Sequence, residues 1–346
     1  MSSNQDELFM QRAMELAELG RGHVSPNPLV GCVIENKGKI IGEGYHEKFG
    51  GPHAEVNAVN SVKDKDQLIG ATVYVNLEPC AHHGKTPPCA DMLAKLPLAR
   101  VVFSNLDPNP LVAGKGFEKL MSAHIRVDQG LLEERGRELN RRFFTFMEKK
   151  RPYIILKWAE TADGFIAREN YDSKWISNEL SRRMVHKWRS EEDAVLVGTN
   201  TALYDNPQLN VRDWTGRDPV RLVIDKQLQI AEGFHLLDGK QPTIVYNEVK
   251  GNIEQKMVEY VKVDHQDNMI EAIVQDLYAR RIQSVIVEGG AHLLKSFIEM
   301  NLWDEARVFR SPVTFGTGIA APFLRGHLVH RDSFKEDEML VYKRVE

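Results

Sequence analysis

The segments Pro52-His53-Ala54-Glu55 and Glu78-Pro79-Cys80, with Cys89 after eight intervening residues, decide the fold of the first half of the chain. One imidazole and two thiolates can supply three ligands of a tetrahedral zinc site, which leaves the fourth position open to water as in catalytic zinc sites. His-x-Glu followed by Pro-Cys is the signature of zinc deaminases, in which the Glu acts as general acid and base. Zinc lowers the pKa of bound water from ~16 towards ~7, so a hydroxide nucleophile is available at neutral pH. The alternative, ordinary packed or solvated side chains, is disfavoured because all these residue types occur together.

The composition is that of an ordinary globular protein long enough for two domains: 346 residues, of which 42% are hydrophobic and 27% charged. A net charge of −4 argues against nucleic acid or an anionic membrane as the main partner. The N-terminus shows no signal-peptide pattern, and no apolar run reaches the ~20 residues of a membrane span. Cys32, Cys80 and Cys89 offer no disulfide framework, so we expect a cytoplasmic enzyme in which Cys32 is a small buried residue.

Apolar periodicity and turn residues predict an alternating α/β pattern in the first 150 residues. Asp6 is expected to cap a helix to about residue 19, and residues 131–149 are expected to form one closing helix. A helix that starts at His53 and another that starts at Cys89 would carry the metal ligands. The other expected elements are strands at 30–35, 40–45, 72–76, 100–104 and 125–128 and a helix at 115–123. A charged run that ends at Pro152 predicts domains of 1–150 and 151–346.

The second half predicts another α/β domain with a mostly parallel sheet. Its expected strands cover 153–158, 194–197, 220–225, 243–246, 284–288 and 305–309, and its expected helices cover 179–188, 268–281 and 291–301. The strand that ends near Glu288 runs into Gly289-Gly290 and a helix, which lets a phosphate approach the backbone at a helix N-terminus. A tight turn explains the two glycines equally well.

Three stretches of the first half carry a resemblance to a known family: Pro26-Asn27-Pro28-Leu29-Val30-Gly31, the insert Ala81-His82-His83-Gly84-Lys85-Thr86-Pro87-Pro88, and Asp107-Pro108-Asn109-Pro110-Leu111-Val112-Ala113-Gly114-Lys115-Gly116. They resemble the deaminase half of the bifunctional riboflavin-biosynthesis deaminase/reductase family (RibD/RibG), which implies a cytidine-deaminase-like three-layer domain. The resemblance implies removal of the 2-amino group from 2,5-diamino-6-ribosylamino-4(3H)-pyrimidinone 5′-phosphate. It places zinc on His53, Cys80 and Cys89, gives Glu55 the catalytic proton transfer, and implies substrate contacts for Asn27, His46, His82 and Lys85. Loop stabilisation is the alternative role of these last four residues.

Five stretches of the second half resemble the same family's reductase domain: Leu156-Lys157-Trp158-Ala159, residues 162–167, Asp172-Ser173-Lys174-Trp175-Ile176-Ser177, Val197-Gly198-Thr199-Asn200-Thr201 and Asp205-Asn206-Pro207-Gln208-Leu209. That domain is similar to dihydrofolate reductase in fold and uses NADPH. The implied reaction reduces the ribosyl group to ribityl, with hydride delivered to C1′ of the opened imine, and gives 5-amino-6-(5-phosphoribitylamino)uracil. The partners are therefore small phosphoribosyl pyrimidines, and the relatives suggest a homo-oligomer formed through the reductase domain.

The resemblance also assigns roles in the second half. Lys157 and Asp205 are the catalytic polar groups nearest the reacting centre. The cofactor positions are Ala159, Trp175, Thr201, Asp205, Gly290, Ala291, His292, Leu293, Leu294, Lys295 and Ser296. The substrate positions are Ser173, Arg189, Leu209, Arg212 and Glu288, of which Arg189 and Arg212 are candidates to grip the 5′-phosphate with a guanidinium fork. The alternatives are a core aromatic for Trp175 and a helix end for Arg189.

The chain departs from the family pattern at several positions of the second half. It has Thr161-Ala162-Asp163-Gly164 where the family usually has Ser-Leu-Asp-Gly, and Tyr171 where a Gly often stands. Lys226 replaces a small polar residue that lies near the cofactor in relatives. This lysine is expected either to help bind the 2′-phosphate of NADPH or to be solvated.

Two other functions compete with the bifunctional enzyme. A nucleic-acid deaminase with a binding module is opposed by the wide spacing of the cysteines and by the acidic charge balance. A deaminase whose second half only mediates dimerisation would be distinguished by its failure to bind NADPH and to form the ribityl product.

Overall fold

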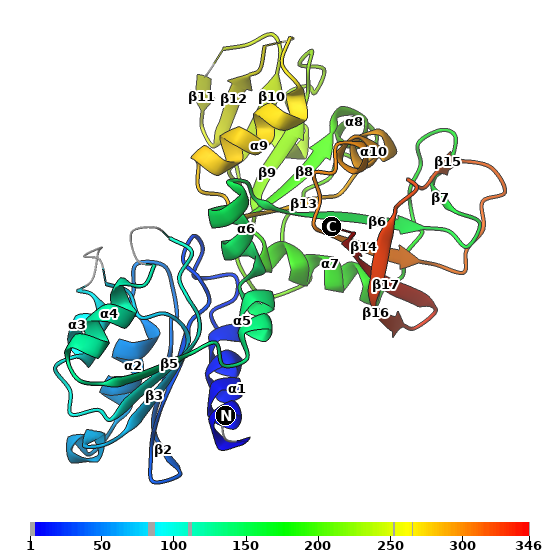
Figure 1. Ribbon diagram of the computed structural model, residues 1–346. Helices are drawn as coiled ribbons and strands as arrows, with labels where there is room; N and C mark the ends of the chain where they lie inside the picture. Colours follow the sequence, from blue (N-terminus) through cyan, green and yellow to red (C-terminus); the bar gives the residue numbers. More distant parts are fainter. Residues whose placement is uncertain (1–3, 82–86, 110–112, 252, 265, 346) are drawn as a thin grey trace. The chain divides into compact units, whose positions relative to one another are not determined.

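The computed structural model describes residues 4–81, 87–109, 113–251, 253–264 and 266–345. The chain divides into two units, Met1–Lys150 and Arg151–Glu346, both drawn in Figure 1. None of the helices within the described ranges is long and apolar enough to cross a membrane.

The first unit is built on a five-stranded sheet in the order β2-β1-β3-β4-β5. Strand β1 is antiparallel to β2 and β3, whereas β3, β4 and β5 run parallel. In chain order the elements are α1 (Asn4–Glu18), β1 (Gly31–Asn36), β2 (Lys39–Tyr45), α2 (Ala54–Ser61), the 3-10 helix η1 (Lys65–Leu68), β3 (Thr72–Leu77), α3 (Cys89–Leu93), β4 (Arg100–Asn105), α4 (Lys115–Ser122), β5 (Arg126–Gln129), α5 (Glu133–Leu139) and α6 (Arg141–Lys149).

The alternation of side chains along each strand sends apolar groups to both faces of this sheet. Val73 and Val75 of β3 share a core with α2, α3 and α4 on one face. Tyr74, between them, belongs to a second core with α1 and Leu139 of α5 on the other face. Because both faces are covered, the central strands are continuously apolar, and the three-layer deaminase-like architecture is confirmed.

Two local predictions in this unit are wrong. Asp6 does not cap α1 but lies inside it, where its carboxylate accepts hydrogen bonds from Arg100 at 2.9 and 3.1 Å and from the Tyr74 hydroxyl at 2.5 Å. Residues 131–149 form two helices because Asn140 interrupts them at φ −101° and ψ 23°. Its side-chain amide bonds both the N–H and the C=O of Leu29, at 2.8 and 2.9 Å, and this distant partner competes with helix continuation.

The second unit is built on a ten-stranded sheet in the order β11-β12-β10-β9-β8-β13-β6-β14-β17-β16. Strands β15 and β7 form a separate two-stranded sheet. Neighbouring strands from β12 to β14 are parallel, so the predicted mostly parallel sheet is confirmed. The elements are β6 (Tyr153–Glu160), β7 (Phe165–Ala167), α7 (Glu179–Glu191), β8 (Ala194–Gly198), α8 (Thr199–Asp205), β9 (Val220–Ile224), the 3-10 helix η2 (His235–Leu237), β10 (Thr243–Asn247), β11 (Ile253–Gln255), β12 (Val258–Lys262), α9 (Met269–Ala279), β13 (Ser284–Val287), α10 (Ala291–Glu299), β14 (Glu305–Arg310), β15 (Ile319–Ala320), β16 (Gly326–Phe334) and β17 (Asp337–Arg344).

Helices α9 and α10 cover one face of this sheet and α7 covers the other (Figure 1). Ile273 of α9 and Phe297 of α10 belong to the core on one face. Val185 and Trp188 of α7 belong to the core on the other face. The carboxyl ends of β9, β8, β13 and β6 are neighbours in the sheet, so the loops that follow these strands gather at one edge.

Candidate active sites

The first candidate site is formed by His53, Cys80 and Cys89, whose ligand atoms all lie within 4.8 Å of one another. His53 is the N-cap residue of α2, Cys80 follows β3, and Cys89 opens α3. The Sγ atoms of Cys80 and Cys89 lie 3.5 and 3.4 Å from His53 Nδ1. Tetrahedral zinc with ordinary Zn–S and Zn–N bonds would hold a sulfur and a nitrogen ligand about 3.6 Å apart. The donor set and its spacing therefore fit zinc.

The two thiols are in direct contact and share a proton in the absence of a metal ion. A hydrogen bond from Cys89 lowers the pKa of Cys80 to about 4, against the effect of burial. The same contact, with burial, raises the pKa of Cys89. The backbone N–H of Cys89 also donates to Cys80 Sγ at 3.3 Å. Both cysteines bind zinc as thiolates, so metal binding at this site would release protons.

Glu55 lies in the first turn of α2, two positions after His53, and is 3% exposed. Burial, followed by the charge of Cys80, raises the pKa of Glu55 to about 7. A carboxyl group with such a pKa can both accept and release a proton near neutral pH. This residue is therefore suited to proton transfer at the metal site.

The structure brings Asn27 and His46 together beside this site. His46 Nδ1 lies 2.9 Å from the carbonyl oxygen of Pro52, to which it must donate. Its Nε2 is then the acceptor for the Asn27 amide at 3.1 Å. Burial lowers the pKa of His46, which agrees with this neutral ring. The ring centroid of His46 lies 5.5 Å from that of His53. His82 and Lys85, the other two expected substrate contacts, lie outside the described residues.

Glu78 is a site residue that the sequence reasoning missed. Its buried carboxylate accepts hydrogen bonds from the backbone N–H groups of Asp107, Gly114, Gly116 and Phe117, at 3.0–3.3 Å. A Cβ at Gly116 would lie 2.1 Å from the carbonyl oxygen of Pro79, so only glycine allows this approach. Glu78 thereby ties the start of α4 to the Pro79-Cys80 turn. Its position directly before Pro79-Cys80 was the only feature of the sequence that could have indicated this role.

The second candidate site is a pocket of about 1150 Å³ at the carboxyl ends of the parallel strands in the second unit. It brings together nearly all the residues that the resemblance assigned there. These are Lys157, Ala159, Ser173, Trp175, Arg189, Thr201, Asp205, Leu209, Arg212, Glu288, Gly290, Ala291, His292, Leu293, Leu294 and Ser296. Lys295 does not line the pocket, and it forms an ion pair with Glu299 at 3.6 Å on α10. Lys226 lines the pocket as well and lies 3.1 Å from Glu248.

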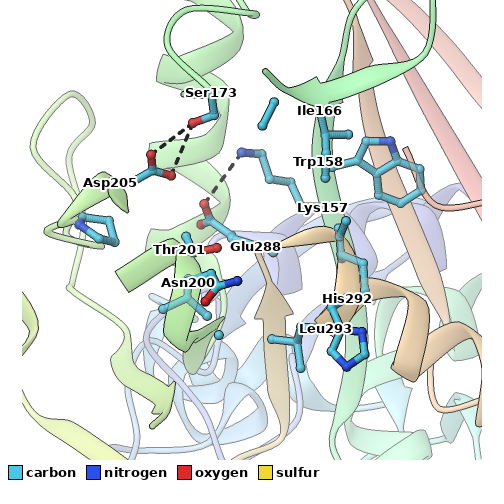
Figure 2. A pocket seen from close by; sticks show the side chains of 18 of the residues that line it. Lys157, Trp158, Ile166, Ser173, Asn200, Thr201, Asp205, Glu288, His292 and Leu293 are labelled. Carbon is cyan, nitrogen blue, oxygen red and sulfur yellow. Dashed lines mark hydrogen bonds and ion pairs between the residues drawn. The ribbon is translucent and has the colours of Figure 1, made fainter. Parts of the chain in front are cut away.

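Glu288 holds two cations in the middle of this pocket. It accepts a bidentate pair of hydrogen bonds from Arg189, at 2.6 and 2.8 Å. It also lies 3.7 Å from the Lys157 ammonium, as Figure 2 shows. Burial alone would raise the pKa of Glu288, but the charges of Arg189 and Lys157 outweigh it and bring that pKa to about 2. Burial lowers the pKa of Lys157, which Glu288 partly opposes. The guanidinium fork of Arg189, expected to grip a phosphate, holds Glu288 in this structure.

Asp205 and Ser173 form a second polar pair in the pocket, as Figure 2 shows. The Ser173 hydroxyl lies 3.2 and 3.3 Å from the two carboxylate oxygens of Asp205, which ends α8. Burial raises the pKa of Asp205, and the bond from Ser173 opposes this effect. The cofactor positions Thr201 and His292 lie apart from this pair, next to Glu288 and at the start of α10.

Further cationic groups line the pocket near Arg189. Arg212 is 48% exposed in its side chain, and its guanidinium lies 3.1 Å from Asn210 Oδ1. His186, which the sequence reasoning missed, lies between the carbonyl oxygen of Asn210 at 2.9 Å and Asp213 at 3.2 Å. Burial and the charges of Arg189 and Arg212 lower the pKa of His186. Of the two arginines, Arg212 is the one more open to an incoming anion.

Known protein families match each of the two units that carry these sites. Residues 3–105 match the cytidine and deoxycytidylate deaminase zinc-binding region, and residues 152–338 match the RibD C-terminal domain. Riboflavin biosynthesis protein RibD of Aquifex aeolicus (strain VF5) is 43% identical over 91% of this chain and 89% of that protein. RibD of Escherichia coli (strain K12) is 37% identical over 90% of this chain and 89% of that protein. A crystal structure of a diaminohydroxyphosphoribosylaminopyrimidine deaminase/5-amino-6-(5-phosphoribosylamino)uracil reductase from Thermotoga maritima is 39% identical, with a TM-score of 0.91 over 99% of both chains.

The fold and the two sites define a class: two-domain enzymes in which a zinc-dependent deaminase precedes a reductase. Relatives of more than 35% identity cover about nine tenths of the chain. The chain belongs to the RibD family of riboflavin biosynthesis proteins, as the resemblance implied, and is a bifunctional deaminase/reductase with zinc and NADPH as its cofactors.

Proposed function

We propose that the first unit removes the 2-amino group of 2,5-diamino-6-ribosylamino-4(3H)-pyrimidinone 5′-phosphate and that the second unit reduces the ribosyl group to ribityl with NADPH. The product would be 5-amino-6-(5-phosphoribitylamino)uracil. The observation that carries this proposal is the convergence of His53, Cys80 and Cys89 beside the buried carboxyl group of Glu55. The pocket of the second unit also supports the proposal, because it combines the buried ion pair of Glu288 and Arg189 with the half-exposed guanidinium of Arg212.

In the deaminase unit, His53, Cys80 and Cys89 would hold the metal. Zinc held there supplies a water molecule whose pKa is lowered towards about 7. Glu55 would take one proton from the attacking water as the C2–O bond forms and would deliver it to the amino group as the C2–N bond breaks, so that one water is consumed and one ammonia is released. The neutral ring of His46 orients Asn27 towards the pyrimidine through their mutual hydrogen bond.

In the reductase unit, NADPH supplies the hydride that C1′ of the sugar accepts. The Gly289-Gly290 backbone and the N-terminus of α10 suit the cofactor's pyrophosphate, because unpaired N–H groups point towards an anion there. C1′ becomes an acceptor when the ribose ring opens to a protonated imine, whose nitrogen becomes a neutral amine once hydride adds to C1′. This opening requires a proton on the ring oxygen. We place the Lys157 ammonium at that oxygen, where Glu288 and Arg189 orient it.

Arg212 is the cation that we assign to the 5′-phosphate. Its guanidinium is half exposed and borders the same pocket as Lys157 and Asp205. Arg189 would support the phosphate only indirectly, because two of its nitrogen atoms are bonded to Glu288.

The test is a turnover assay with the diaminopyrimidine phosphate that follows ammonia and NADPH separately. Ammonia is expected without NADPH, and NADPH oxidation is expected only once deaminated substrate is present. Ammonia release without any ribityl product would reduce the second unit to a non-catalytic module. Release of ammonia from RNA or DNA instead of the small substrate would refute the assigned substrate class.

We also propose that the protein self-associates through its second unit. Strand β16 forms one edge of the ten-stranded sheet, and its Leu328 and Val329 are 45% and 50% exposed. An edge strand presents unpaired backbone groups that can pair with another copy, and these two apolar side chains would be covered by such pairing. A Leu328→Glu/Val329→Glu variant is expected to reduce the molar mass measured by light scattering, whereas Val249→Glu, at another exposed valine, is not. An unchanged mass for the double variant would exclude this edge.

A reducing cytoplasmic location is part of the same proposal. It is supported by Cys32, Cys80 and Cys89, all of which are free thiols, two of them at the metal site.

A further inference from the structure

Two exposed tyrosines form a stacked pair on the wall of the reductase pocket. The rings of Tyr171 and Tyr204 lie with centroids 4.5 Å apart and planes 10° from parallel. Both residues line the pocket, and they are 40% and 56% exposed. In a stacked pair each ring covers one face of the other, so the remaining exposed surface belongs to the outer faces and edges. The pair therefore presents flat aromatic surface to the pocket.

The pair lies at the end of the pocket that holds the substrate-side residues. Tyr204 directly precedes Asp205 at the end of α8, and Tyr171 lies two positions before Ser173, the hydrogen-bond partner of Asp205. Asp205 and Trp175, which the resemblance also assigns to the cofactor, lie in these same two segments, whereas the cofactor position His292 lies apart from Asp205, at the start of α10. The aromatic surface is thus beside the Asp205–Ser173 pair.

The backbone at Tyr171 shows that this ring is kept at a conformational cost. Its φ is +67°, in the left-handed region that residues with a Cβ rarely adopt. Glycine is the residue that accepts this conformation most readily. Residues held in such regions are over-determined by their surroundings and gather at functional sites. The chain nevertheless carries a large aromatic side chain here, packed against a second one.

We propose that Tyr171 and Tyr204 form a platform on which the pyrimidine ring of the reductase substrate stacks. This inference rests on the proposed reduction of a phosphoribosylamino pyrimidine and assigns specificity for the base to two residues. A planar heteroaromatic ring stacks on tyrosine without a need for matched hydrogen bonds. The platform would hold the base while Arg212 holds the phosphate, which leaves C1′ between them beside Lys157 and Asp205.

A different role for the same contact is a latch that fastens the segment around Ser173 to α8. The Ser173–Asp205 hydrogen bond already joins these two segments, so the tyrosine pair would be a second fastening. A latch would weaken every ligand that depends on this segment. A platform would weaken only ligands that carry the base.

The test compares two ligands by calorimetry on the full-length protein: 5-amino-6-(5-phosphoribitylamino)uracil and ribitol 5-phosphate, which lacks the base. In Tyr204→Leu and Tyr171→Gly, the Kd of the uracil is expected to rise about tenfold, as for the loss of one base–aromatic stack. The Kd of ribitol 5-phosphate, which lacks the base, is expected to stay within about twofold. Glycine suits the backbone at position 171, so this variant should remain folded.

Three matched variants complete the design. Tyr171→Phe and Tyr204→Phe keep the rings and should retain the affinity for the uracil. Tyr260→Leu removes a half-buried tyrosine of β12 that does not line the pocket, and it should change neither ligand. Equal weakening of both ligands would show a latch and overturn the platform, and so would an unchanged Kd for the uracil. A wild-type protein that binds the uracil but oxidises no NADPH would refute the proposed reduction while the platform stands.

Discussion

Replacing Glu288 by glutamine should destabilise the second unit, because this carboxylate neutralises two buried cations. The side chains of Glu288 and Arg189 are 6% and 10% exposed, and that of Lys157 is 17% exposed. Glutamine keeps the shape of the side chain but removes its charge. Breaking a buried ion pair in this way typically costs 3–5 kcal/mol, since the partner charge stays buried and uncompensated.

The pKa of Glu288 gives an independent magnitude. Its decrease from the usual 4.5 to about 2 corresponds to about 3 kcal/mol, at about 1.4 kcal/mol for each pH unit. Because the folded-state pKa is lowered, this contribution is fully present above pH 4.5 and is lost as the pH falls towards 2. The difference between wild type and Glu288→Gln should therefore be about 3 kcal/mol at pH 7 and about 2 kcal/mol at pH 3.5.

Thermal unfolding of the full-length protein, followed by circular dichroism, would measure this difference. The transition of the reductase unit is the one that NADPH shifts to higher temperature, since a ligand stabilises the state that binds it. For a unit of this size, 3 kcal/mol corresponds to a decrease in Tm of about 6–12 °C. The control Glu299→Gln removes only an exposed pair with Lys295 and should shift Tm by no more than about 1–2 °C. An unchanged Tm for Glu288→Gln at pH 7, or a difference that does not shrink at pH 3.5, would refute the reasoning.

Three further predictions concern the two sites. Glu55→Gln should retain zinc by metal analysis yet lower the rate of ammonia release by about 10²–10⁴-fold, and near-normal deamination would remove Glu55 from its assigned role. Cys80→Ser should lose both zinc and ammonia release while NADPH oxidation with deaminated substrate stays within about twofold; a parallel loss of reduction would contradict the assignment of the metal to the deaminase alone. Lys226→Ala, which removes a cation that is 55% exposed at the pocket wall, should raise the KM for NADPH about fivefold with no change for NADH, and equal effects on both cofactors would argue against a 2′-phosphate contact.

The metal site could be predicted from the sequence because its chemistry is set by residue types in two short segments. A helix that starts after His53 and another that starts at Cys89 are local features, and both were expected at the positions where they occur. The alternation of apolar strands and amphipathic helices likewise determined the α/β class. The exact ends of helices depended on single side chains. The break between α5 and α6 at Asn140 was missed because the hydrogen-bond partner of Asn140, Leu29, lies 111 positions away in the sequence.

The short strands were also beyond the reach of sequence patterns. Strands β7 and β15 have three and two residues and exist because they pair with each other across more than 150 positions. Such segments carry too few residues to show a period, so pairing rather than propensity defines them.

The sequence by itself determined that His53, Cys80 and Cys89 can hold zinc with Glu55 beside them, since these residue types and spacings already specify the chemistry. Only the tertiary structure decided what Arg189 binds. Glu288 lies 99 positions further along the chain, and it meets Arg189 because β13 inserts between β8 and β6 in the sheet. The fold thus gives Arg189 a buried carboxylate partner that also lies 3.7 Å from the Lys157 ammonium, and the role of Arg189 as a phosphate contact stays a prediction. The same long-range packing created the stacked pair of Tyr171 and Tyr204, which no local pattern could have predicted.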